Sequence, residues 1–325
     1  MPQPTQSDLY VDRLLTNISL AYAQESTNFV APQVAPVIRV KKQSGLYTVY
    51  DKNFFRRDLM SPRAPSTEAA GAGYEVNNTG SYYCNVFSLR KDIDDDEARN
   101  ADEVFELKKE ATMLLTQASM IRMERSFATD VFATSKWTGS HTGSDITVSN
   151  AWTSSSGTPF ADVDLEKDSI LKKTGYLPNK LVCGRRAWNA LKNSDDVQDR
   201  IKHTSREAIT TEMVARLLEL DEIVVCNASY VSSAEGASSA TNAFINEQDD
   251  ALLLYVPRNP GRYTPSAAYT FVWSGDDGMG LNEFGAAIKD YRIERIKSDR
   301  VEINQYFDVV QTGADLGAYF DNVYS

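Results

Sequence analysis

The chain has 325 residues, of which 42% are hydrophobic and 24% charged, the proportions of a folded protein that can bury a sizeable core. Its formal net charge of −11 repels nucleic acid and so disfavours electrostatic steering of the whole chain toward it. The first residues have neither a basic region nor an apolar run, and no apolar run reaches the roughly 18 residues that span a bilayer. We therefore expect no secretion signal and no membrane span.

Residues 1–40 are predicted to form an arm rather than part of a core. Pro32 and Pro36 interrupt the apolar segment around them and favour extended backbone. The apolar side chains of this segment need an apolar surface elsewhere, which we expect on another subunit. The alternative is an edge strand that packs on its own domain. The arm also contains a short amphipathic piece with Leu9, Tyr10, Leu14, Ile18 and Tyr22.

Residues 41–92 are predicted to form an extended hairpin. Apolar and aromatic residues alternate around 46–50 and again around 82–87, as in strands. The segment between them, SPRAPSTEAAGAGY, is rich in Pro, Ala and Gly and predicts a long, loose tip.

Charges of opposite sign gather in two neighbouring segments. Between residues 39 and 63 there are seven basic residues against two acidic ones, and between 92 and 110 nine acidic residues against three basic ones. A positive hairpin and a negative helix in one chain can pair between copies. The alternative is two solvated faces. The resulting candidates for inter-subunit contact are Arg39, Lys41, Lys42, Lys52, Arg56, Arg57, Arg63, Asp94, Asp95, Asp96 and Glu103.

The clearest helix is predicted over residues 97 to about 128. Asp94 with Glu97 forms a capping-box pattern, and acids in the first turn complement the helix dipole. Apolar residues step by three and four, which predicts one buried face; at 1.5 Å per residue the helix would be roughly 45 Å long. A coiled coil is the alternative, but the apolar run is single and short. The predicted face consists of Val104, Leu107, Ala111, Leu114, Ala118 and Ile121.

Residues 170–227 alternate helix and strand signals with short connections. Gly175 is suited to a left-handed helix cap, and apolar runs at 180–183 and 222–226 predict buried strands. Helical spacing is found around Trp188 and again over 209–220. The segments 134–160 and 229–242 are rich in Ser, Thr, Ala and Gly and predict loops, the first with a small hairpin as an alternative.

The last third is predicted to be rich in strands. Strand candidates are 251–256, 269–273, 291–296 and 301–310, with a tight turn at 298–300. The aromatic tail, AYFDNVYS, is expected to be packed.

Motifs for catalysis or metal binding are missing from the sequence. His141 and His203 are the only histidines and neither lies near a Ser or Cys motif, whereas a hydrolytic triad needs one. Cys84, Cys183 and Cys226 are widely spaced and are expected to be small core residues in a reducing compartment. The acidic segment 276–283 lacks the alternating ligands of a calcium loop and predicts a turn. We expect no cofactor and no resident metal.

The central stretch resembles the major capsid proteins of tailed phages with the Hong Kong 97 fold. Many of them contain the pattern G-x-x-P-N-x-L-V-x-G-x-x-x-W-x-x-L, followed by D-x-x-x-R-I and a strand with I-V-V. The matching residues are Gly175, Pro178, Asn179, Leu181, Val182, Gly184, Trp188, Leu191, Asp196, Arg200 and Ile201.

The resemblance implies an α+β fold with five regions. These are an N-terminal arm (1–40), an extended β-hairpin or E-loop (41–92), a peripheral domain with a long spine helix (93–160), an axial α/β domain (161–284) and returning strands of the peripheral domain (285–325).

It also implies a structural, non-enzymatic role as the major capsid protein of a virion, assembled in the host cytoplasm from pentamers and hexamers into an icosahedral shell around double-stranded DNA. Implied partners are other copies of the chain, a separate scaffolding protein, a portal, a decoration protein and DNA bound without sequence preference. The alternatives are an encapsulin-like compartment shell and a cytosolic enzyme with an unrecognised carboxylate site.

Overall fold

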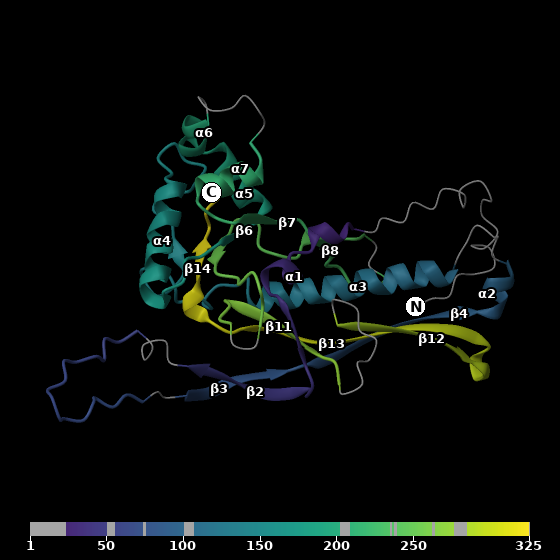
Figure 1. Ribbon diagram of the computed structural model, residues 1–325. Coiled ribbons are helices and arrows are strands. Elements are labelled where there is room, and N and C mark those ends of the chain that lie inside the picture. The colour runs from purple at the N-terminus through teal and green to yellow at the C-terminus, as the bar shows by residue number, and fades with distance from the viewer. Residues whose placement is uncertain are drawn as a thin grey trace.

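The computed structural model describes residues 24–50, 56–73, 76–100, 107–201, 209–234, 236, 239–261, 264–275 and 285–324, with the backbone alone for 48–50 and 76–79. The described chain has a compact part with several short helices, an elongated part along one long helix, and a hairpin that projects beyond both (Figure 1). It is a mixed α+β fold, as predicted.

The compact part is built on a five-stranded sheet in the order β5-β14-β10-β6-β7. Strands β6 and β7 are parallel to each other, and β10 is antiparallel to both of its neighbours, β6 and β14. Helices α4 to α7 pack against one face of this sheet (Figure 1). The bounds are β5 Ile146–Thr147, α4 Pro159–Thr174, β6 Lys180–Gly184, α5 Arg185–Asn193, α6 Asp195–Ile201, α7 Thr211–Leu217, β7 Glu222–Cys226, β10 Ala251–Leu254 and β14 Gly317–Asp321.

The pattern that carries the family resemblance has a structural explanation in this part. Helix α4 ends at Gly175, whose φ of 81° is the left-handed cap that the sequence predicts. The side-chain amide of Asn179 exchanges two 2.9 Å hydrogen bonds with the backbone of Val256 and donates a third, of 3.0 Å, to Asp221. Asn179 therefore joins the start of β6 to two other segments.

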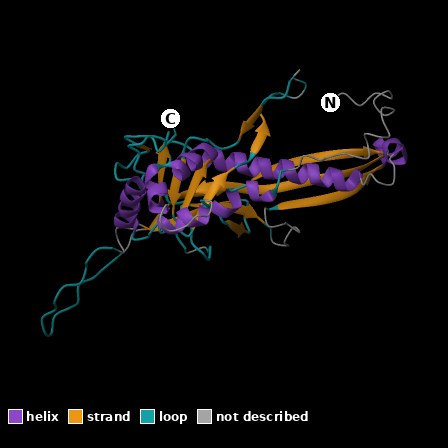
Figure 2. Cartoon of the chain, turned by 90° about the horizontal axis from the view of Figure 1, so that it is seen from above, coloured by secondary structure: helices purple, strands orange, loops and turns teal. Residues whose placement is uncertain are grey.

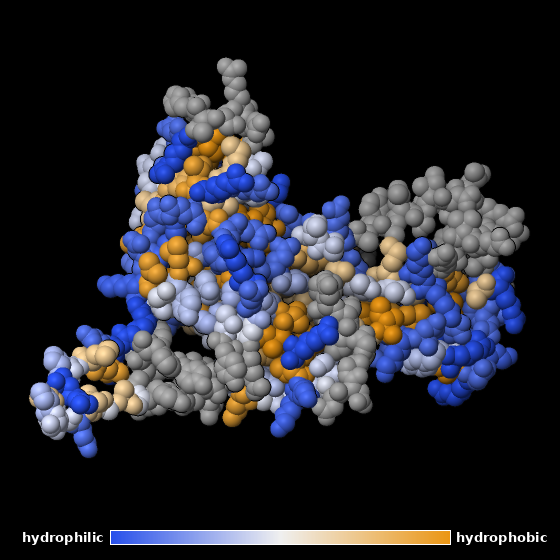
Figure 3. All heavy atoms as spheres, in the orientation of Figure 1, coloured by the Kyte–Doolittle hydropathy of each residue, from blue (hydrophilic) through white to orange (hydrophobic). Residues whose placement is uncertain are grey.

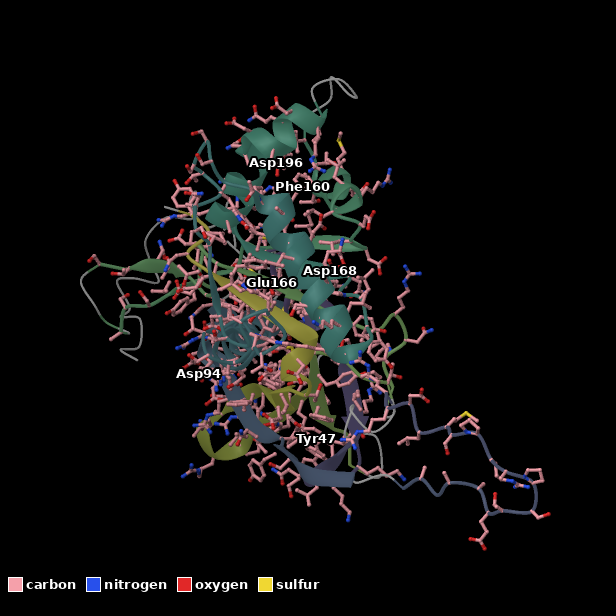
Figure 4. All side chains as sticks on the ribbon, turned by 90° about the vertical axis from the view of Figure 1, so that its left-hand side faces the viewer. Tyr47, Asp94, Phe160, Glu166, Asp168 and Asp196 are labelled. Atoms are coloured by element: carbon pink, nitrogen blue, oxygen red, sulfur yellow. The ribbon has the colours of Figure 1, made fainter. Side chains whose placement is uncertain are left out.

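The second half of the pattern packs α5 and α6 against the sheet. Trp188 is 6% exposed and belongs to the main apolar cluster of the compact part. Arg200 pairs with Asp196 one helical turn earlier, and its guanidinium lies 3.9 Å from the ring centroid of Phe160 on α4. Phe160 and Asp196 lie close together at one end of α4 (Figure 4). These residues therefore hold the compact part together.

Replacing Gly184 with alanine should destabilise the subunit by roughly 1–3 kcal/mol, the usual cost of overpacking a core. A Cβ at this position would overlap the backbone of Gln248, which cannot move as freely as a side chain. The matched control is Gly71→Ala, since a Cβ at Gly71 meets no atom within 4 Å. Urea unfolding of the two variants measures the difference, and equal midpoints would refute the crowding at Gly184.

The elongated part is a second five-stranded sheet covered by helix α3. Strand β13 is its centre: β12 and β11 pair along one edge and β4 along the other, all antiparallel, and β1 adds in parallel to β11. Helix α3 lies over the long strands β4, β12 and β13 (Figures 1 and 2). The bounds are β1 Val37–Val40, β4 Asn85–Asp94, α2 Asp95–Asn100, α3 Leu107–Asp130, β11 Ala268–Trp273, β12 Ala286–Ile293 and β13 Ser298–Gln311.

The long helix is confirmed over 107–130, but its predicted buried face is partly wrong. The buried side chains of α3 follow a four-residue step, and Leu114 is 58% exposed. Since a four-residue step overshoots one turn by about 40°, the stripe winds around the helix. Its first part packs on the long strands and its second part on the compact part. Residues 101–106, which the prediction places in the same helix, lie outside the described residues.

Two loop predictions are also corrected. The turn between β12 and β13 is formed by residues 294–297 and not by 298–300, with Lys297 at a φ of 47° and Ser298 already in β13. Residues 146–147 form a single strand, β5, that is parallel to β14 rather than part of a local hairpin. The aromatic tail is packed as predicted, because β14 is buried along most of its length.

Residues 29–40 pack on their own chain, which is the alternative that the sequence leaves open. Helix α1, Ala31–Val34, and strand β1 lie against α3 and β11, and Val30 and Val34 are buried among core residues. The buried carboxylate of Glu124 on α3 accepts hydrogen bonds from the backbone N–H groups of Val30 and Ala31, at 3.0 and 2.9 Å. Burial raises the pKa of Glu124. The amphipathic piece at 9–22 lies outside the described residues.

Candidate assembly surfaces

The projecting hairpin consists of β2, Ser44–Tyr50, and β3, Val76–Tyr83, which are antiparallel as predicted. An aromatic cluster fixes its base. Tyr47 of β2 and Tyr82 of β3 stack on Phe271 of β11, with ring centroids 5.8 and 4.7 Å apart, and Cys84 is buried beside them. Figure 4 shows Tyr47 at this base, well away from the end of the loop. The base of the hairpin therefore packs on the elongated sheet.

The loop at the end of the hairpin is exposed to solvent along its described length. Every described residue from 56 to 73 is exposed, and the loop extends beyond the body of the molecule (Figures 1 and 2). The guanidinium of Arg56 reaches a distant segment, where it donates to the carbonyls of Lys172 and Lys173 at the end of α4. A cation at a helix C-terminus is favourable.

The basic candidates are spread over this region without a common pocket. Arg39 is an exposed residue of β1, Lys41 and Lys42 are exposed just after it, and Arg57 and Arg63 lie in the exposed loop. Arg56 makes a contact within its own chain, at the end of α4. Lys52 lies outside the described residues.

The acidic candidates lie at the far end of the elongated sheet, and part of their charge is neutralised within the chain. The guanidinium of Arg292 on β12 donates two hydrogen bonds, of 2.7 and 2.8 Å, to the carboxylate of Asp95. This ion pair lowers the pKa of Asp95. Asp96 pairs with Arg99 at 3.7 Å, while Asp94 is the exposed last residue of β4. Glu103 lies outside the described residues. The sequence missed Arg292 because its pairing depends on the antiparallel return of β12.

A further surface that the sequence missed is apolar. Figure 3 shows apolar atoms at the surface over α3 and β12. Met113 and Leu114 of α3 are 46% and 58% exposed, and Ile288 of β12 is 43% exposed. Exposed apolar patches mark interaction surfaces in soluble proteins. The exposure of Leu114 that contradicts the predicted helix face therefore contributes to a candidate contact.

The histidines, the cysteines and the acidic segment that the sequence analysis considered for chemistry can now be placed. The backbone N–H of His141 donates to the buried carboxylate of Glu166 at 2.8 Å, and the imidazole Nδ1 contacts the same carboxylate. His203 and the acidic segment at 276–283 lie outside the described residues. Cys84, Cys183 and Cys226 are all buried and unpaired by disulfides. The described residues contain no cluster of three or more His, Cys, Asp or Glu side chains that could hold a metal ion. No helix in the described part is long and apolar enough to cross a bilayer.

Comparisons with known proteins agree with these features. Residues 121–267 match the family described as Phage major capsid protein E. The major capsid protein of Burkholderia phage BcepMu is 25% identical over 312 residues, which cover 94% of each chain.

Solved structures show the same fold. A phage-related protein from Bordetella bronchiseptica RB50 has a TM-score of 0.70 at 21% identity, covering 92% of this chain and 93% of the other. The capsid of cyanophage P-SCSP1u has a TM-score of 0.60 at 12% identity, covering 98% and 94% of the two chains. An encapsulin complex from Synechococcus elongatus PCC 7942 has a TM-score of 0.53 at 12% identity, covering 97% of both.

An elongated sheet with a projecting hairpin, a long helix and a compact α/β part is therefore a fold that this chain shares with phage capsid and encapsulin subunits. The family match, the relative along nearly the whole chain and the capsid folds together identify a major capsid protein of a tailed phage, a structural protein of the virion. The capsid structures among its neighbours fit an icosahedral shell.

Proposed function

We propose that copies of this chain associate as pentamers and hexamers, and that these close into an icosahedral shell around double-stranded DNA. The observation that carries the proposal is the hairpin, whose exposed loop reaches beyond its own subunit and leaves its side chains available to another. Many weak contacts of this kind become strong together when the assembly closes.

The regions of the proposed shell subunit follow the structural parts. Most of the compact part would be the axial domain, predicted at 161–284, and most of the elongated part the peripheral domain, predicted at 93–160 and 285–325. These bounds need correction, because β5 and β14 belong to the compact sheet and β11 to the elongated sheet. The hairpin would be the E-loop, predicted at 41–92, although β4 from residue 85 pairs in the elongated sheet, and residues 1–40 would be the N-terminal arm, although β1 pairs with β11. The antiparallel pairing of β4, β12 and β13 supports the return of 285–325 to the sheet that begins at 85.

Between subunits, the basic loop would contact the acidic end of a neighbouring elongated sheet. The residues proposed for these contacts are Arg39, Lys41, Lys42, Lys52, Arg57 and Arg63 on one side and Asp94, Asp96 and Glu103 on the other. Asp95 would contribute through its ion pair with Arg292, which leaves the carboxylate 26% exposed. Arg56 would act within the subunit, by holding the loop at the end of α4.

The proposal includes further partners, with assembly in the host cytoplasm. A separate scaffolding protein would guide closure and a portal would occupy one vertex, while a decoration protein could bind outside. The net charge of −11 supports weak contact with DNA that lacks sequence preference, since counterion release needs basic clusters. The encapsulin-like shell is the second candidate, because an encapsulin shares this fold at 12% identity. Packaged DNA rather than a cargo protein in purified particles would distinguish the first from the second.

Arg63→Glu should leave the subunit folded and slow shell assembly several-fold. Arg63 is exposed in the loop, so its replacement removes no contact from the core, whereas a reversed charge at the rim of an interface lowers the association rate. Light scattering at low ionic strength measures the rate, and circular dichroism checks the fold.

Arg63→Lys is the matched control, since it keeps the charge and should assemble like the unmodified chain. The difference between Arg63→Glu and the unmodified chain should shrink as salt is added, because screening at about 0.1 M acts over about 10 Å. Equal assembly rates for the two variants at low salt would contradict an electrostatic role of the loop.

A further inference from the structure

Strand β4 is an outer strand of the elongated sheet, and β13 is its strand partner in the described part of the chain. The N–H of Asp95, one residue beyond β4, donates to the carbonyl of Lys297 in the same ladder, at 3.2 Å. Bonding to a given side alternates along an antiparallel strand, so the odd-numbered residues of β4 bond to β13 and the even-numbered residues point to the outer edge. Cys84, just before β4, fits this alternation, because its N–H donates to Gln43 and not to β13.

The outer edge of β4 is open. It consists of the backbone N–H and C=O groups of Val86, Ser88, Arg90 and Asp92, and none of these groups has a hydrogen-bond partner among the described residues. An unpaired edge of this length is a template for a strand of another chain. The charges of Arg90 and Lys91 restrict which strand can pair there, since charged side chains on an edge oppose unspecific pairing.

One flank of helix α3 is apolar along this edge. Ala111 and Leu115 are buried against the sheet, and at about 100° per residue Lys108 and Leu114 lie on opposite sides of this pair. The ammonium group of Lys108 binds Asp290 of β12 at 3.0 Å, so Leu114 lies on the flank toward β4. Leu114 is 58% exposed.

Leu89 continues this apolar surface on β4. It shares a face with Ile93, four residues further along the strand, and Ile93 packs with Ala111 and Leu115 of α3. Leu89 is 48% exposed although it lies on the face that carries α3. Leu89 and Leu114 therefore leave an apolar strip beside the open edge, and a strand added to β4 would cover it.

A second copy of β4 fits this edge in one register. The two longest symmetric antiparallel pairings of β4 with itself extend over residues 86–94 or over residues 85–93. The first places Arg90 opposite Arg90 of the second copy, and like charges directly opposite are destabilising. The second places Leu89 opposite Leu89 and Arg90 opposite Ser88, with no like charges in contact.

The other pairs of this register are also favourable. Lys91 lies opposite Phe87 of the second copy on the face that carries α3, where a cation and an aromatic ring attract each other. Asp92 lies opposite Val86, and its charge is already neutralised by Arg300 of its own chain, through hydrogen bonds of 2.6 and 2.9 Å.

We propose that β4 pairs with β4 of a second copy around a two-fold axis, with the two Leu89 side chains facing each other on the axis. The pairing would join two elongated sheets into one, satisfy the open backbone groups and cover the apolar strip of both copies. Such a contact uses the same surface on each subunit. Its place in the shell, between subunits of adjacent pentamers or hexamers, rests on the proposed function.

A symmetric disulfide tests the pairing on the assembled full-length chain. Leu89 would form a non-hydrogen-bonded pair with its counterpart, with Cα atoms about 4.5 Å apart, inside the range of about 4.4–6.8 Å found in disulfides. The control is Ser88→Cys, on the adjacent exposed residue, whose counterpart lies diagonally across the pair at about 7–8 Å. On oxidation, Leu89→Cys should form a covalent dimer at least tenfold faster than Ser88→Cys.

Non-reducing electrophoresis measures the dimer, and mass spectrometry identifies the 89–89 link, which supports the proposal. Equal rates for the two variants, or no dimer in either, would overturn the pairing of β4. Electron microscopy of the same samples separates this outcome from a failure of the proposed function. Closed shells without the 89–89 link would overturn the two-fold pairing alone, whereas the link in small oligomers that never form shells would support the pairing and contradict the shell.

Discussion

Replacing Trp188 with alanine should lower the free energy of unfolding of the subunit by about 3–5 kcal/mol, the cost of truncating a buried aromatic side chain. Trp188 lies in the apolar cluster between α5 and the sheet of the compact part, and only 6% of its surface is exposed. The loss combines the transfer of the indole to water with the cavity that remains. Denaturant unfolding followed by circular dichroism measures it.

Two further variants make this measurement specific. Trp188→Phe keeps an aromatic ring in the cluster and should lose less than the alanine variant. Leu46→Ala on β2 is the surface control, because Leu46 is 68% exposed and should change stability by no more than about 0.5 kcal/mol. An alanine variant at 188 that unfolds like the Leu46 control would show that Trp188 is not part of the core.

Shortening the hairpin should abolish shell formation without unfolding the subunit. Tyr50 and Val76 are paired across β2 and β3, so residues 51–75 can be replaced by Asn-Gly, which closes a tight two-residue turn. Every described residue of the removed loop is exposed, so its removal takes away surface contacts such as that of Arg56 but no core side chain, and the melting temperature should change little. Electron microscopy and sedimentation would detect the missing shells.

A loop of unchanged length separates reach from sequence. If residues 64–73 are replaced by Gly and Ser, the loop keeps the length that lets it extend to a neighbour. A variant that still assembles, but more slowly than the unmodified chain, would assign the contacts that remain to the basic residues at the start of the loop. Complete shells from the Asn-Gly variant, at the yield of the unmodified chain, would remove the hairpin from the assembly mechanism.

The sequence predicted those elements whose signals are local. The buried strands at 180–184 and 222–226 have continuous apolar runs, and the left-handed cap at Gly175 favours glycine. Alternating apolar residues on both sides of a segment rich in Pro, Ala and Gly predict the hairpin. The family pattern extends from Gly175 to Ile201, where Asn179, Gly184 and Trp188 meet tight structural requirements. Segments that pack against these three positions impose the requirements, but each requirement allows few residue types, so the sequence itself shows it.

The features that the sequence missed depend on partners far away along the chain. The buried stripe of α3 could not be placed because the helix packs on two different surfaces along its length, which shifts the face. The acidic segment looked free because Arg292 and Arg300 reach it through strands about 200 residues later. The packing of residues 29–40 on their own chain depends on Glu124, a buried carboxylate in the middle of a long helix.

The burial of the three cysteines has a consequence for the particle after it leaves the cell. Burial raises the pKa of the Cys84 thiol to about 12 and raises those of Cys183 and Cys226 as well. The thiolate is the form that oxidants attack, so these groups react slowly in air. Oxidants in air should therefore not cross-link neighbouring subunits of the coat readily through these three positions.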